Sequence, residues 1–107
     1  MKYALILAPS AVEDLRQLAA KDRSAVVEAM EVHLRREPTK TSKSRIKRLR
    51  GLRKSQYRLR VNDVRVFYDM RDMTVEVLAI VSKDNANQWL ADEGETDEGN
   101  SSLGSEG

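Results

Sequence analysis

The stretch QYRLRVNDVRVFYDM, residues 56–70, has the alternating pattern of a β-hairpin. Apolar residues at 57, 59 and 61 alternate with Arg58 and Arg60, and after a turn at Asn62-Asp63 the residue Arg65 lies between two valines. Asn and Asp tolerate the left-handed geometry of tight hairpin turns. Like charges on neighbouring strands destabilise a sheet. Three arginines on this hairpin therefore predict that one of its faces binds an anion.

The segments around the hairpin predict an α+β fold. Residues 2–8 are expected to form a short strand, and residues 74–81 form the last and most apolar strand. The order β-α-α-β-β-β predicts a small twisted antiparallel sheet with a two-helix hairpin packed on one face. The polar and basic residues 38–46 are expected to form a loop.

Two helices are expected between the first strand and this loop. Ser10, followed by Glu13, has the spacing of a capping box after Pro9. Asp22 is expected to cap the second helix, which Pro38 ends. Only two or three residues separate the helices, so they should form an antiparallel pair.

The charge distribution divides the chain in two. All 19 Lys and Arg lie in residues 1–89, whereas residues 90–107 hold six acidic residues and no basic one. The body thus carries 19 basic against 11 acidic residues, a charge of about +8, which is typical of nucleic-acid binding. We expect one folded domain over residues 1–89 and an acidic, disordered tail over residues 90–107.

The composition excludes several kinds of chemistry. The chain has no cysteine, so it has no disulfide framework and no thiolate metal site. His33 is the only histidine and is expected to be a packing or surface residue. The segment YALILA, residues 3–8, is too short to span a bilayer. We expect a cytoplasmic protein with no membrane association, no metal and no cofactor.

Strand alternation predicts a basic face. If residues 57, 59 and 61 face the helices, Arg58 and Arg60 face the other side with Arg65, and Lys83 follows the last strand. Guanidinium groups bind phosphate bidentately, and a cluster of them stabilises a phosphoryl transition state. RNA supplies its own nucleophile, the 2′-hydroxyl, so these four residues are predicted to cleave RNA without a metal or a histidine. The residues predicted to bind RNA around them are Lys47, Arg48, Arg50, Arg53, Lys54 and Trp89.

Trp89 has two interpretations. As the only tryptophan, beside a basic sheet, it can stack on a nucleobase. It can equally cap the core at the edge of the sheet, and the sequence does not separate these roles.

Two segments resemble the RelE/ParE superfamily of toxin–antitoxin toxins. They are APSAVEDLRQLAAKDRSAVVEAM for the helical pair and LRGLRKSQYRLRVNDVRVFYDM for the sheet, followed by VEVLAIVSKDNANQW. The spacing L-R-G-L and then Y-R-x-R-x-x-D-x-R-V-x-Y is similar to the RelE-like branch. The resemblance covers about residues 2–89 and implies a β-α-α-β-β-β toxin of a type II toxin–antitoxin system.

The resemblance implies a ribosome-dependent mRNA endonuclease that inhibits translation and uses no metal. It implies that Arg58 and Arg60 contact RNA, that Arg65 holds the scissile phosphate, and that Lys83 assists the leaving group. Lys83 and Trp89 replace the arginine and tyrosine usual in the family, and tryptophan has no hydroxyl to act as a base. The implied partners are a RelB-like antitoxin, in a hetero-oligomer, and the 70S ribosomal A site with its mRNA.

Two other functions are compatible with the sequence. One is a ParE-like inhibitor of DNA gyrase, which is not an enzyme. The other is a catalytically weakened toxin that acts as an antitoxin-binding module. The full basic set Arg58, Arg60 and Arg65 favours the nuclease over the gyrase inhibitor.

Overall fold

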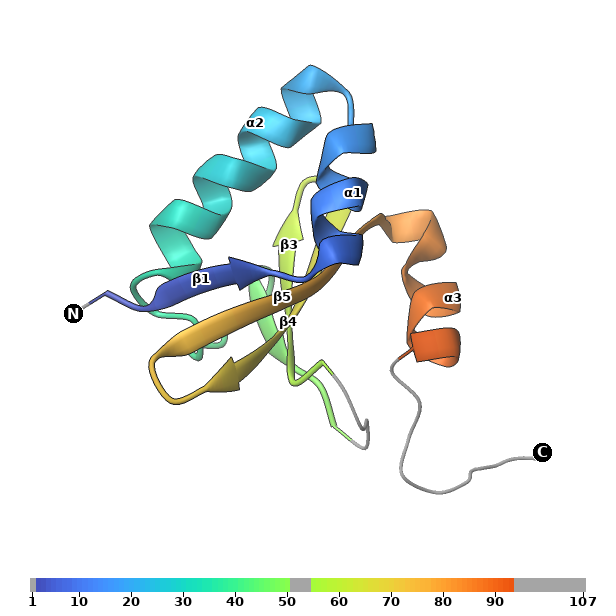
Figure 1. Ribbon diagram of the computed structural model, residues 1–107. Helices are drawn as coiled ribbons and strands as arrows, with labels where there is room; N and C mark the ends of the chain where they lie inside the picture. Colours follow the sequence, from blue (N-terminus) through green and yellow to red (C-terminus); the bar gives the residue numbers. More distant parts are fainter. Residues whose placement is uncertain (1, 51–54, 94–107) are drawn as a thin grey trace.

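The computed structural model describes residues 2–50 and 55–93 (Figure 1). In chain order the elements are β1 (Ala4–Leu7), α1 (Pro9–Gln17), α2 (Ala20–Ala29), the π-helix η1 (Met30–Leu34), β2 (Ile46–Arg48), β3 (Tyr57–Val61), β4 (Val64–Arg71), β5 (Thr74–Ser82) and α3 (Lys83–Glu93). The predicted α+β class, with a helical pair followed by a three-stranded meander, is confirmed. In the described part of the chain, no helix is long and apolar enough to cross a bilayer.

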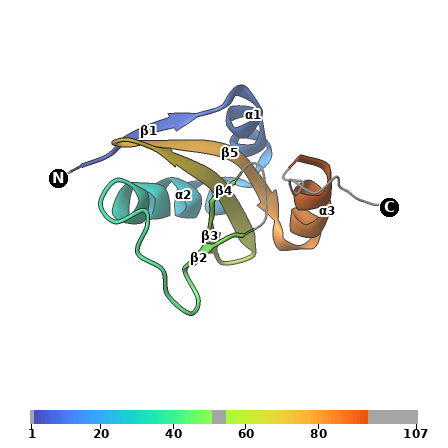
Figure 2. The ribbon, with the colours of Figure 1, turned by 90° about the horizontal axis from the view of Figure 1, so that it is seen from below.

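The five strands form one sheet in the order β1-β5-β4-β3-β2 (Figure 2). β3, β4 and β5 pair antiparallel, as predicted, and β2 pairs antiparallel with β3, whereas β1 pairs parallel with β5. Short turns join β3 to β4 and β4 to β5, and short turns impose antiparallel pairing. Asn62 and Asp72 take left-handed backbone angles in these turns, with φ of 54° and 56°. Three helical elements and three strands separate β1 from β5 in the chain, so no turn sets the direction of β1.

One face of the sheet packs against α1 and α2 and forms the main core. Leu59, Val66 and Tyr68 alternate onto this face and are fully buried. The helices contribute Ala11, Val26, Met30 and Leu34. Burial of each large apolar side chain stabilises the fold by about 1.5–3 kcal/mol. The Tyr68 ring stacks on Tyr57, and its hydroxyl donates a hydrogen bond of 2.5 Å to the carbonyl oxygen of Pro38.

A second apolar cluster lies on the opposite face under α3. Phe67 and Ala79 are 0% and 1% exposed, pair with each other across β4 and β5, and lie outside the main core. The Trp89 ring stacks on Phe67 with centroids 4.6 Å apart. Figure 1 shows α3 well apart from α2. Part of the face expected to be open is therefore covered by α3.

The predicted helix caps are wrong. The hydroxyl of Ser10 does not cap α1; it donates to the carbonyl oxygen of Leu78 at 3.1 Å, and Pro9 begins the helix. Proline fits the first helical position because that residue needs no amide hydrogen. Asp22 lies inside the first turn of α2, where it favours the helix dipole without capping the helix. The Arg23 side chain donates to three carbonyl oxygens at the end of α1, those of residues 15, 16 and 18.

Two elements were not predicted. β2 is an edge strand of three residues where the sequence suggested only the end of a loop. α3 continues through Leu90 to Glu93, so the first residues of the predicted tail are helical. The acidic segment 94–107 lies outside the described residues.

Replacement of Tyr68 with Phe is expected to lower the free energy of unfolding by about 1–3 kcal/mol, because the Pro38 carbonyl loses a buried donor. Burial raises the pKa of Tyr68 above its ordinary 10.0, with a smaller contribution from Tyr57. A raised pKa in the folded state means that this stability is complete below the unfolded-state pKa and is lost as pH rises above it. Wild-type stability should therefore fall above about pH 10, and the Phe variant should lose less.

Urea denaturation at neutral and at alkaline pH measures both effects. Tyr3→Phe is the control, because Tyr3 is only partly buried. A Tyr68→Phe protein as stable as the wild type at neutral pH would contradict the role of this hydrogen bond.

Candidate phosphate-binding site

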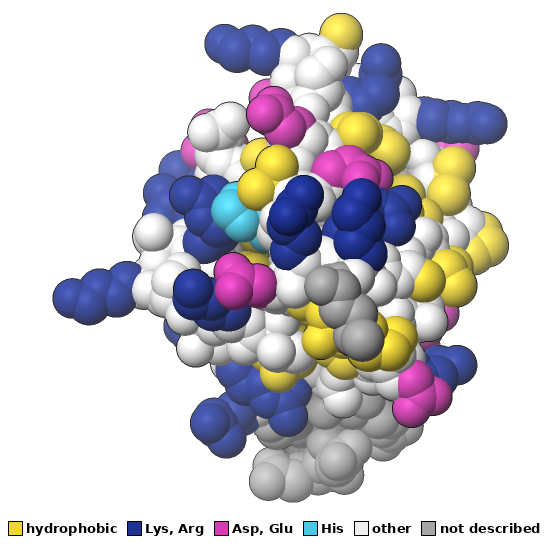
Figure 3. Space-filling model, turned by 90° about the vertical axis from the view of Figure 1, so that its left-hand side faces the viewer, with side chains coloured by type: hydrophobic (Ala, Val, Ile, Leu, Met, Phe, Trp, Pro, Cys, Tyr) yellow, Lys and Arg dark blue, Asp and Glu magenta, His cyan; other side chains and the backbone are white. Residues whose placement is uncertain are grey.

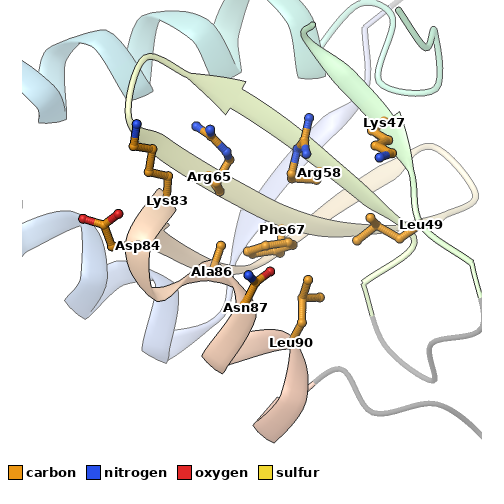
Figure 4. A pocket seen from close by; sticks show the side chains of 10 residues that line it. All are labelled: Lys47, Leu49, Arg58, Arg65, Phe67, Lys83, Asp84, Ala86, Asn87 and Leu90. Atoms are coloured by element: carbon orange, nitrogen blue, oxygen red, sulfur yellow. The ribbon is translucent and has the colours of Figure 1, made fainter. Parts of the chain in front are cut away.

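Four basic side chains from four elements lie in a row along one cleft (Figure 4). They are Lys83 at the start of α3, Arg65 on β4, Arg58 on β3 and Lys47 on β2. Apolar and amide side chains of α3 lie across from them in Figure 4. The cleft has a volume of about 460 Å³, and its lining residues are Lys47, Leu49, Arg58, Arg65, Phe67, Lys83, Asp84, Ala86, Asn87 and Leu90.

Strand register places these cations on one face. Lys47 pairs with Arg58 across β2 and β3, and Arg58 pairs with Phe67 across β3 and β4. Paired residues point to the same face of a sheet. The cleft therefore lies on the α3 side of the sheet, beside Phe67, and away from the main core.

Arg58 is the most confined of the four cations. Its Nε is buried and has no hydrogen-bond partner among the described residues. Burial lowers the pKa of the Arg58 guanidinium, and the nearby charges of Arg65 and Arg60 lower it further. A buried donor without a partner costs free energy. An anion in the cleft would supply the negative charge that offsets the repulsion among these cations.

Arg65 is oriented by the turn that precedes it. Its Nη1 donates to the carbonyl oxygens of Asn62 and Val64 at 2.9 and 3.2 Å. Arg60 pairs directly with Arg65 across β3 and β4, but it is exposed and does not line the cleft. The structure thus brings Arg58, Arg65 and Lys83 together and leaves Arg60 beside them.

Lys83 lies against the same turn. Its ammonium nitrogen is 3.7 Å from a carboxylate oxygen of Asp63, and its backbone N–H donates to the carbonyl oxygen of Asp63 at 2.7 Å. Asp84 follows it and is the carboxylate among the lining residues, at the Lys83 end of the cleft (Figure 4).

The predicted RNA-binding residues fall in different places. Lys47 lines the cleft, whereas Arg48 lies on the opposite face, with its guanidinium 5.1 Å from the centre of the Tyr57 ring. Arg50 is exposed and does not line the cleft. Arg53 and Lys54 lie outside the described residues.

Trp89 does not line the cleft. Its ring is partly exposed, and Phe67 covers one of its two faces. This contact is the kind expected of a residue that caps a core. Stacking on a nucleobase stays a prediction and would have to use the other face of the ring.

Sequence reasoning missed the wall that α3 contributes to the cleft, which is made by Asp84, Ala86, Asn87 and Leu90. No periodic signal in the sequence pointed to this helix. His33 lies at the end of η1 and does not line the cleft; burial and the charge of Arg45 lower its pKa. Among residues 2–50 and 55–93, no cluster of three or more His, Cys, Asp or Glu could hold a metal ion.

Solved structures of RelE toxins share this fold. A toxin–antitoxin complex RelBE2 from Mycobacterium tuberculosis contains a chain 27% identical, with a TM-score of 0.61, over 77% of this chain and 99% of that chain. The RelE–RelB complex of Pyrococcus horikoshii matches at 24% identity and a TM-score of 0.64, over 78% and 97%. A double arginine-to-alanine mutant of the toxin RelE from E. coli, in the free state, matches at 21% and 0.62, over 83% and 92%.

The sequence itself identifies the family. The model for the family described as ParE toxin of type II toxin–antitoxin system, parDE, matches residues 5–86, and the chain belongs to this family. It is thus a type II toxin of the RelE/ParE superfamily, as the resemblance implied. No curated relative matches the chain.

Replacement of Trp89 with Ala is expected to lower the free energy of unfolding by about 1–3 kcal/mol, because it uncovers the buried ring of Phe67. Trp89→Phe keeps an aromatic partner and should cost less. Urea denaturation gives the stability, and amide hydrogen exchange reports the opening of α3. Gln88→Ala, at an exposed neighbouring position, is the control. Wild-type stability and exchange in Trp89→Ala would show that the stack does not hold α3.

Proposed function

We propose that this toxin binds a phosphodiester of mRNA in the cleft and cleaves it. The row of Lys47, Arg58, Arg65 and Lys83 is the observation that carries this proposal. The partly buried guanidinium of Arg58 supports it, because a phosphate would offset the repulsion from the neighbouring charges of Arg65 and Arg60. The cations of this row that contact the reacting phosphate would stabilise the dianionic transition state more than the singly charged ground state.

In the reaction, RNA supplies the nucleophile and the cleft supplies the cations. The substrate 2′-oxygen attacks phosphorus, the bond to the 5′-oxygen breaks, and a 2′,3′-cyclic phosphate forms. We assign phosphate binding to Arg58 and Arg65. Lys83, at the end of the row, would donate a proton to the leaving 5′-oxygen or stabilise its charge.

The 2′-hydroxyl of the substrate has to lose its proton to a general base. Among the described residues that line the cleft there is no histidine or tyrosine, and an arginine is a poor base. We expect the 2′-hydroxyl proton to pass to solvent or to a group of the ribosome. Positioning and electrostatic stabilisation would then supply most of the rate enhancement.

An antitoxin is the partner that the relatives suggest. Three of the similar structures are RelB–RelE type complexes, from M. tuberculosis, P. horikoshii and Methanococcus jannaschii. We propose that a RelB-like antitoxin forms a hetero-oligomer with this chain and blocks the basic cleft. The target of the unbound toxin would be mRNA in the ribosomal A site, in the cytoplasm.

Inhibition of DNA gyrase without catalysis is the second candidate. It is favoured by the match to the ParE family model, and the described lining of the cleft contains no histidine or tyrosine that could act as a base. Toeprinting of mRNA on programmed ribosomes, beside a supercoiling assay with purified gyrase, separates the two. Cleaved mRNA with unaffected supercoiling supports the nuclease, and the reverse result supports the gyrase inhibitor.

Replacement of Arg65 with Ala should lower the single-turnover cleavage rate by about 10²–10³-fold, because an oriented transition-state contact is lost. Arg71→Ala is the matched control: Arg71 is exposed, at the far end of the same strand. The assay is cleavage of mRNA on programmed ribosomes, with circular dichroism to verify folding. Wild-type rates in a folded Arg65→Ala protein would refute the role of Arg65.

Binding to RNA should weaken steeply as salt rises, because each phosphate contact releases counterions. Lysine and arginine side chains are also spread over the face that carries the histidine (Figure 3). Lys47 lines the cleft, so Lys47→Ala should remove one phosphate contact. The slope of log K against log salt concentration should then become shallower by about one. Titration of a fluorescent 2′-O-methyl RNA at several salt concentrations measures this slope. An unchanged slope in Lys47→Ala would place the bound RNA elsewhere.

A further inference from the structure

The turn between β3 and β4 contacts both cations at one end of the cleft. The carbonyl oxygen of Asn62 accepts a hydrogen bond from Arg65 at 2.9 Å. The carbonyl oxygen of Asp63 accepts the backbone N–H of Lys83 at 2.7 Å, and the Asp63 carboxylate lies 3.7 Å from the Lys83 ammonium. Two adjacent residues therefore hold two cations that come from different elements.

We propose that Asp63 is a positioning residue, which aligns Lys83 with Arg65 so that both reach one phosphate. Its carbonyl fixes the backbone at the start of α3, and its carboxylate restricts the side chain of Lys83. The inference rests on the proposed function, in which Lys83 assists the leaving 5′-oxygen.

The exposure of this ion pair argues for positioning rather than stability. The side chains of Lys83 and Asp63 are 55% and 85% exposed. Exposed ion pairs add little to the free energy of unfolding. A lysine side chain is long and flexible, however, so even a weak tether reduces the number of orientations it samples before reaction.

The negative charge of Asp63 has the opposite effect on binding. A carboxylate beside a basic cleft repels phosphate, so its removal should strengthen RNA binding. Positioning predicts that cleavage slows at the same time. Tighter binding with slower cleavage is the combination that separates positioning from a general electrostatic effect.

Asp63→Asn tests the proposal because it keeps the backbone carbonyl and removes the charge. Asp72→Asn is the matched control: it removes the same charge from the other hairpin turn, where Asp72 is also exposed. We expect single-turnover cleavage by Asp63→Asn to be about threefold slower, an effect of the size that an exposed ion pair supports. Binding of 2′-O-methyl RNA should be tighter, and Asp72→Asn should cleave at the wild-type rate. Asp63→Glu, which restores a carboxylate, should recover part of the rate.

A double-mutant cycle identifies the residue through which Asp63 acts. In a Lys83→Met background, Asp63→Asn should cause no further loss of rate, because the group it aligns is absent. An equal loss with and without Lys83 would overturn the proposal. So would a wild-type rate in Asp63→Asn.

A measurement that needs no cleavage keeps this inference separate from the proposed function. Side-chain NMR relaxation at the Lys83 Cε should show greater mobility in Asp63→Asn and no change in Asp72→Asn. If this result is obtained but the wild type cuts no RNA, the proposed function fails and the tether of Lys83 stands. Equal Lys83 mobility in Asp63→Asn and the wild type overturns the inference whatever the activity.

Discussion

The register between β3 and β4 is the constraint on which the rest of the molecule depends. It places Arg60 against Arg65 and Arg58 against Phe67 on one face, and it places Leu59 against Val66 on the other. A slip of one residue would move the arginines into the core and the apolar side chains out of it. Burial of the apolar face therefore fixes the arginines in place, although their mutual repulsion is unfavourable. The core thus holds together a cluster of charges that would otherwise separate.

Alternation along the hairpin was enough to predict much of this arrangement. It predicted the three-stranded meander and the face of the sheet that carries Arg58 and Arg65. Lys83 follows the last strand, as expected. The helical pair followed from its apolar spacing. The helix caps could not be predicted from local sequence, because the hydroxyl of Ser10 bonds to the carbonyl oxygen of Leu78, which lies 68 residues away in the sequence. A local sequence motif contains no information about a competing partner so far away in the sequence.

The two elements that were not predicted, β2 and α3, affect the lining of the cleft more than they affect the fold class. β2 has only three residues, yet it directs Lys47 into the cleft and its neighbour Arg48 onto the opposite face. A count of basic residues does not distinguish Lys47 from Arg48. Their side chains point to opposite faces because both residues lie on a strand. α3 has no clear apolar stripe in the sequence, so we expect its helix to depend on tertiary contacts such as the stack of Trp89 on Phe67. That contact is also why Trp89 could not be assigned from the sequence.

α3 links the stability of the domain to the chemistry of the cleft. It covers Phe67 and Ala79, forms one wall of the cleft, and begins at Lys83. The apolar area beneath it is much smaller than the core under α1 and α2, so α3 should open at a lower free energy than the rest of the fold. Because Lys83 is the first residue of this helix, an opening of α3 that reached its first turn would also move one of the four cations. Arg58 and Arg65 lie on β3 and β4, so such an opening would leave both arginines in place.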